Sequence, residues 1–152
     1  MILSDKAIAE FKKILEESIG SLFKNQPNLS KFTSETNQHE VNLCHHLANE
    51  ISKFLDGYDC DLDIIKRNLE NKRPDIIFHK RDNHDDNLLV IEVKRSESHE
   101  GTEDDIKKIK EYWMQEPLSY KFGASIVLDI SKREAQGVIF SDNENLDLKV
   151  AL

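Results

Sequence analysis

The chain has 152 residues and a formal net charge of −8; 38% of the residues are hydrophobic and 33% are charged. This length and composition predict one globular domain, residues 1–152, and exclude a disordered chain. They also exclude a nucleic-acid coat protein, because coating phosphates requires an excess of Lys and Arg.

The chain also lacks the marks of membrane or secreted proteins. No apolar run approaches the ~20 residues of a membrane span, and the N-terminus is too polar for a signal peptide. Cys44 and Cys60 are the two cysteines, and they indicate no disulfide framework. We therefore expect a reduced, cytoplasmic protein that does not act at a membrane.

Residues 4–25 are predicted to form an amphipathic helix with Ser4 as a suitable N-cap. Its apolar side chains fall three or four positions apart, at Ile8, Phe11, Leu15, Ile19 and Leu22. This N-terminal helix either packs on the core or mediates dimerisation, and the pattern alone does not separate the two.

Residues 35–55 carry a second apolar stripe at helical spacing. Glu40 lies at the edge of that stripe, because Leu43, Cys44 and Leu47 follow it three, four and seven positions later. An acid on the core-facing side of a helix needs a reason. The alternative is an ordinary exposed helical glutamate.

Residues 58–67 are predicted to form the first strand, because apolar and acidic side chains alternate along them. Two further strands follow as an antiparallel pair. The apolar runs 76–78 and 88–94 have the β-branched content of buried strands, and the segment 79–87 between them contains no apolar residue.

Charged residues stand at one end of this predicted hairpin. Side chains alternate across a strand, so Glu92 and Lys94 point to one face while Val93 points to the other. Asp75, at the mouth of the neighbouring strand, is expected to reach the same place. Charges buried in this way need a partner or a metal ion.

The remainder of the chain predicts a helix at 102–115, a strand at 122–130, and a terminal hairpin formed by 136–141 and 146–150. The inner face of the helix is expected to carry Ile106, Ile109, Tyr112 and Trp113. The aromatic residues among these are interpreted as core rather than as base-stacking platforms.

Pro74-Asp75, followed by Glu92-Val93-Lys94, resembles the signature of the PD-(D/E)XK nuclease superfamily, which has the restriction-endonuclease-like fold. The acid-x-Lys pattern alone does not single out one site, because five such triplets occur, starting at Glu10, Glu70, Glu92, Asp105 and Asp147. The triplet at Glu92 alone closes a long apolar strand and has Pro-Asp upstream across a hairpin loop.

A subgroup of small stand-alone members is similar over a longer stretch. Its motifs correspond here to Arg73-Pro74-Asp75, Asn87 to Lys94, Asp105 to Ile109 (Asp-x-x-Lys-Leu, with Ile in place of Leu) and Tyr120 to Gly123. The resemblance implies an α/β fold with an α-β-β-β-α-β core over residues 35–130. That core is a mixed central sheet flanked by helices, to which this chain adds an N-terminal helix and a C-terminal hairpin.

The resemblance also implies a reaction, the Mg²⁺-dependent hydrolysis of phosphodiester bonds in DNA, with Mn²⁺ as a substitute ion and no small-molecule cofactor. Asp75, Glu92 and the Val93 carbonyl are then the metal ligands, and Glu40 completes the shell or binds a second ion. Lys94 orients or deprotonates the attacking water. An acid on the first strand, Asp61 or Asp63, is a further candidate for holding the metal or its waters. Cleavage of both strands requires a homodimer, because one domain has one site.

Two alternatives stay open. In a catalytically inactive relative, Lys94 and Glu92 form a structural ion pair and the domain is a binding module. In an interaction protein, the helix at 4–25 docks a partner.

Other basic residues and the histidines have plainer interpretations. The dibasic pairs at residues 66–67, 72–73, 80–81 and 94–95 either line a phosphate track or are solvated strand ends. His79 shares the face of Asp75 and is a candidate phosphate contact, with an exposed strand end as the favoured interpretation. The remaining histidines lack zinc-ligand spacing.

Overall fold

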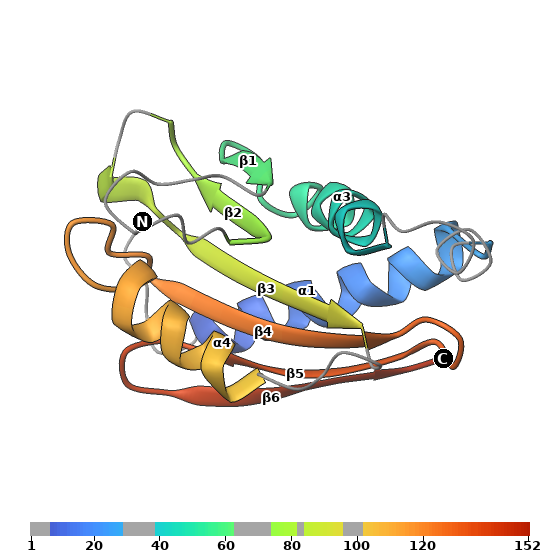
Figure 1. Cartoon of the computed structure of the whole chain (residues 1–152). Helices are drawn as coiled ribbons and strands as arrows, with labels where there is room; N and C mark the ends of the chain where they lie inside the picture. Colours follow the sequence, from blue (N-terminus) through green and yellow to red (C-terminus); the bar gives the residue numbers. More distant parts are fainter. Residues whose placement is uncertain (1–6, 29–38, 63–73, 82–83, 96–101) are drawn as a thin grey trace.

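The computed structural model describes residues 7–28, 39–62, 74–81, 84–95 and 102–152 (Figure 1). Of residues 39–41 and 84 it describes the backbone alone. The helices are α1 (Ala7–Asn25), α3 (His39–Ser52) and α4 (Thr102–Lys108), with a 3₁₀ turn at His84–Asp86 and a π-helical turn at Ile109–Trp113. The strands are β1 (Asp59–Leu62), β2 (Ile76–His79), β3 (Leu89–Arg95), β4 (Phe122–Asp129), β5 (Glu134–Phe140) and β6 (Asn145–Ala151).

These strands form one six-stranded mixed sheet in the order β1-β2-β3-β4-β5-β6. Every neighbouring pair is antiparallel except β3 and β4, which are parallel. Parallel neighbours need a crossover connection, and α4 with the π-helical turn lies within that connection. The fold is therefore α/β, with an open sheet.

The helices cover both faces of the sheet. Leu89, Ile91 and Val93 pack into a cluster with buried residues of α1 and α3. Ile77 and Val90 belong to a second cluster, which contains residues of the π-helical turn and the segment after it. In Figure 1, α4 lies in front of the sheet and α1 behind it. The alternation predicted for β3 is confirmed, since Val93 and Val90 lie on opposite faces.

Helix α1 packs on the core. Its apolar stripe is buried, and the helix contacts α3, β5 and β6. Asn25 also donates a hydrogen bond of 3.0 Å to Glu50, which ties the end of α1 to α3. The described part of α1 thus uses its apolar stripe to pack on the core. Docking of a partner by this helix stays a prediction.

The predicted elements are found, with changes at their ends. The predicted N-cap Ser4 and the second half of the strand at 58–67 lie outside the described residues. Among the helices that the structure describes, none is long and apolar enough to cross a membrane.

The predicted inner face of the helix at 102–115 is wrong at one residue, Tyr112. The Met114 N–H donates to the Ile109 carbonyl at 3.0 Å, which is a π-helical bond spanning five residues. This wider turn rotates the residues that follow it. Ile109 and Trp113 are therefore buried, whereas Tyr112 is 37% exposed.

Candidate active site

The carboxyl groups of Asp75 and Glu92 meet on the α4 face of the sheet. In the β2–β3 pairing, Ile76 lies opposite Ile91, and continuing that register by one residue sets Asp75 opposite Glu92. Opposite residues of an antiparallel pair have Cβ atoms about 4.5–5.5 Å apart. The Val93 N–H donates to Asp75 Oδ2 at 2.7 Å, and a side-chain hydrogen bond joins Asp75 to Glu92. The two acids are thus neighbours, as the motif requires.

Glu92 is almost completely buried, and its pKa reflects this. Burial raises the pKa of Glu92 well above its ordinary value, and the negative charge of Asp75 raises it further. A hydrogen bond from Lys108 acts in the opposite direction. The negative charge of Asp75 thus disfavours ionisation of Glu92, and the positive charge of Lys108 favours it.

Lysine 94 shares this face, but its partner is unexpected. Lys94 Nζ lies 3.4 Å from Asp105 Oδ2, and Glu92 Oε1 is instead contacted by Lys108 Nζ at 2.7 Å. The Glu92–Lys94 ion pair expected for an inactive relative is therefore not the pairing that the structure has. Both lysines are held by a carboxylate, and each ion pair crosses from β3 to α4.

Asp105 and Lys108 are therefore two residues of the site that the sequence interpretation missed. They lie three positions apart on α4, a spacing that puts two side chains on one side of a helix. The Asp-x-x-Lys motif contains both residues and is the signal for them in the sequence. Its connection to Glu92 depends on how α4 packs across the sheet.

Glu40 is in the first turn of α3, and its side chain lies outside the described residues. Helix α3 packs on the face of the sheet opposite to Glu92 and Asp75. The predicted role of Glu40 stays a prediction.

Asp61, the candidate acid on β1, has partners other than Asp75 and Glu92. Asp61 accepts hydrogen bonds from Arg81 at 2.7 Å and 3.1 Å, and its other close contact is His79 Nε2 at 2.6 Å. The pKa of Asp61 is lowered, chiefly by the Arg81 hydrogen bond and also by His79. Asp63 lies outside the described residues.

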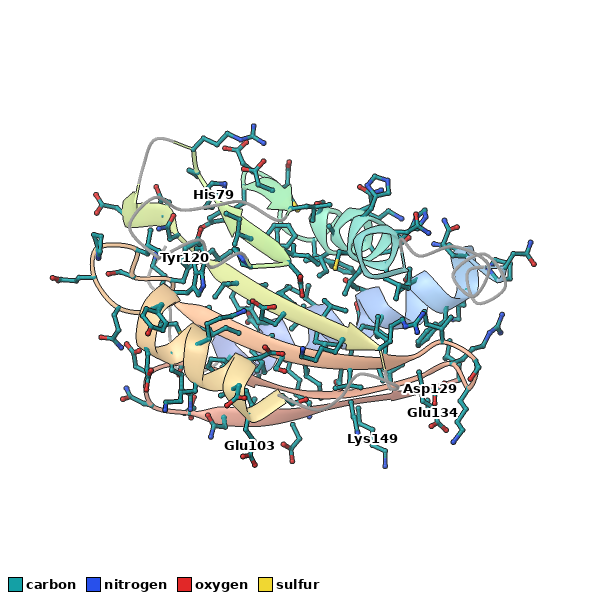
Figure 2. The ribbon with its side chains drawn as sticks, in the orientation of Figure 1. His79, Glu103, Tyr120, Asp129, Glu134 and Lys149 are labelled. Atoms are coloured by element: carbon teal, nitrogen blue, oxygen red, sulfur yellow. The ribbon has the colours of Figure 1, made fainter. Side chains whose placement is uncertain are left out.

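The interpretation of His79 as an exposed strand end is wrong. The residue is only 5% exposed, because Asp61 on β1 covers it and Tyr120 lies near the same end of the sheet (Figure 2). Burial raises the pKa of Tyr120, and the charge of Asp61 adds to that effect, which places the two side chains near each other. His79 is four residues from Asp75, or about 13 Å along a strand, so this group is separate from the carboxyl pair.

In each dibasic pair that the structure describes, one member is paired with an acid. Arg81 is neutralised by Asp61 and Asp59, and Lys94 by Asp105. The pairs at 66–67 and 72–73 lie outside the described residues.

A hollow of about 360 Å³ opens beside the last three strands of the sheet. Its lining comes from β4, β5 and β6, where Figure 2 marks Asp129, Glu134 and Lys149. Val127, also in the lining, pairs with Lys94 across β3 and β4. None of the predicted site residues lines the hollow, so its size alone does not make it the functional site.

Within the described part of the chain, no group of three or more His, Cys, Asp and Glu side chains is arranged to hold a metal ion. Asp75 and Glu92 are therefore a pair of neighbouring carboxyl groups, and their role as metal ligands stays a prediction. Comparison of the chain with protein-family models, with curated proteins and with solved structures finds no match.

Proposed function

We propose that this protein is a metal-dependent nuclease of the PD-(D/E)XK type that hydrolyses phosphodiester bonds in DNA. The observation that carries the proposal is the contact between the Asp75 and Glu92 carboxyl groups, with Lys94 on the same face of the sheet. The order of elements from α3 to β4, which is helix, three strands, helix and strand, also supports it.

The residues present fit a hard divalent cation. Carboxylate and carbonyl oxygens are the ligands that Mg²⁺ prefers, and Mg²⁺ usually keeps several waters, so a complete protein cage is not needed. Asp75, Glu92 and the Val93 carbonyl would hold the ion, with Glu40 as a further ligand. Glu92 Oε1 is buried and contacts Lys108 Nζ at 2.7 Å, so a bound ion would share this oxygen with an ammonium group or displace it. The bound ion would activate water and offset charge on the phosphate.

The protein's own residues have separate tasks in this scheme. The Val93 N–H holds the Asp75 carboxylate in place through its 2.7 Å hydrogen bond. Lys94, paired with Asp105, would orient the attacking water, or would accept its proton after first losing one of its own. The buried surroundings of Glu92 strengthen each of these electrostatic contacts, because a low local dielectric screens them less.

A second candidate has an observation of its own. Glu92 pairs with Lys108, and Lys94 pairs with Asp105, so the carboxyl and ammonium groups of the cluster neutralise one another in part. A self-neutralised cluster of this kind is also what a catalytically inactive binding module of the same fold would keep. Metal binding and cleavage distinguish the two candidates.

The test is nicking of supercoiled plasmid in Mg²⁺ or Mn²⁺, with EDTA as the metal-free condition. Asp75→Asn and Lys94→Ala should each abolish nicking. The acid-x-Lys triplet on β6 supplies matched controls, because Asp147→Asn and Lys149→Ala alter exposed residues and should leave nicking unchanged. Activity that survives both site substitutions, or a wild-type protein that neither binds metal nor cuts, would overturn the proposal.

A further inference from the structure

Lys108 occupies the position on Glu92 where a metal ion would bind. Its ammonium nitrogen lies 2.7 Å from Glu92 Oε1, while Asp105 keeps the other nearby lysine, Lys94, at 3.4 Å. We propose that Lys108 is a built-in cation that competes with the divalent ion for Glu92 and releases this carboxylate when the ion binds. This inference rests on the proposed function.

The placement of Lys108 differs from that of the lysine beside it. The Lys108 side chain is 25% exposed and faces the sheet, whereas Lys107 is 70% exposed and pairs along the helix with Glu111 at 4.0 Å. Neighbouring residues of a helix point in different directions. The sequence thus provides two adjacent lysines, of which the structure sets one against the carboxyl pair and the other toward solvent.

The charges explain why the two cations compete. Asp75, Glu92 and Asp105 bring three carboxyl groups to the cluster, and Lys94 and Lys108 bring two ammonium groups. An ammonium and a divalent ion on the same carboxylate oxygen repel each other, strongly so where water is excluded. Binding of one therefore weakens binding of the other, and the coupling is reciprocal.

Release of Lys108 is sterically reasonable. A lysine side chain has a flexible stem, and this one is already partly exposed. It can swing toward solvent without unfolding α4. Asp105 has the complementary role, because its hold on Lys94 keeps a second ammonium from taking the place that Lys108 leaves.

The experiment measures Mn²⁺ and Mg²⁺ affinity by isothermal titration calorimetry in the full chain. Lys108→Met should bind the ion about tenfold more tightly than wild type, within the usual range of coupling between sites. Lys108→Arg keeps the positive charge and should remain near wild type, and Lys107→Met is the matched control that should not change. Unchanged or weaker binding by Lys108→Met overturns the inference.

A measurement on the wild type covers the case in which Lys108→Met fails to fold. Lysine acetylation followed by mass spectrometry should label Lys108 several-fold faster when Mn²⁺ is added, while labelling of Lys107 stays constant. Equal labelling of Lys108 with and without Mn²⁺ overturns the inference.

Asp75→Asn separates this inference from the proposed function. If Asp75→Asn abolishes ion binding but Lys108→Met has wild-type affinity, the metal site stands and the competition fails. If neither the wild type nor any variant binds Mn²⁺ or Mg²⁺, both fail.

Discussion

Gly123 is predicted to be essential for the close packing of β4 against the π-helical turn that follows Lys108. A Cβ atom at this position would lie 2.5 Å from Cγ2 of Ile109 and 2.5 Å from Cε2 of Phe140. Carbon atoms in contact are about 3.5–4.0 Å apart, so each neighbour would have to move by about 1 Å. Both neighbours are fully buried, which leaves them little room.

Overpacking a closed core costs about 1–3 kcal/mol. We therefore expect Gly123→Ala to lower the free energy of unfolding by about 1–3 kcal/mol. The displaced Ile109 directly follows Lys108, so the same substitution should also disturb the Lys108–Glu92 contact and change metal affinity.

Gly20→Ala is a control that should change the free energy of unfolding in the opposite direction. Gly20 lies inside helix α1, and a Cβ there would meet no atom within 4 Å. Alanine is favoured over glycine in a helix by about 1 kcal/mol, so Gly20→Ala should raise the free energy of unfolding. Urea denaturation followed by circular dichroism measures both variants. The reasoning is refuted if Gly123→Ala proves as stable as the wild type.

Other predictions concern acid stability, the π-helical turn and subunit number. The Arg81 hydrogen bond lowers the pKa of Asp61 in the folded protein. This hydrogen bond therefore stabilises the fold above the pKa that Asp61 has in the unfolded chain, and the stabilisation is lost as pH falls through the pKa of Asp61 in the folded protein. Asp61→Asn should flatten that acid limb in urea denaturation across a pH series, and an unaltered limb would contradict the pairing. Trp113→Ala should cost about 3–5 kcal/mol in urea denaturation, whereas Tyr112→Ala should cost less than about 1 kcal/mol; equal losses would contradict the burial of Trp113 and the exposure of Tyr112. Double-strand cleavage in one encounter should require a homodimer, so a species that light scattering finds strictly monomeric but that still cuts both strands would disprove it.

The hairpin and its acids were predictable because local rules decide them. Apolar runs of strand length bounded by polar loops specify β2 and β3, and the two-residue period of a strand puts Glu92 and Lys94 on one face. The partners of the two lysines were not predictable in this way. An ion pair between β3 and α4 depends on the height and rotation of the helix over the sheet, and residues 96–101 separate the two elements in sequence.

The burial of His79 and the exposure of Tyr112 have the same kind of cause. His79 ends its strand, and only the position of β1 brings Asp61 over it. Tyr112 lies inside the turn that the Met114–Ile109 hydrogen bond widens, a departure from the α-helical period that the sequence pattern does not reveal.

By itself, the sequence determined the α/β class, the order of the elements and which acids share a strand face, because these follow from periodicity and chain direction. Tertiary structure alone decided that Lys108 contacts Glu92 and that Asp105 contacts Lys94. Charges attract across a few ångströms of space whatever their separation along the chain. Their pairing therefore becomes known only when the helix is set on the sheet.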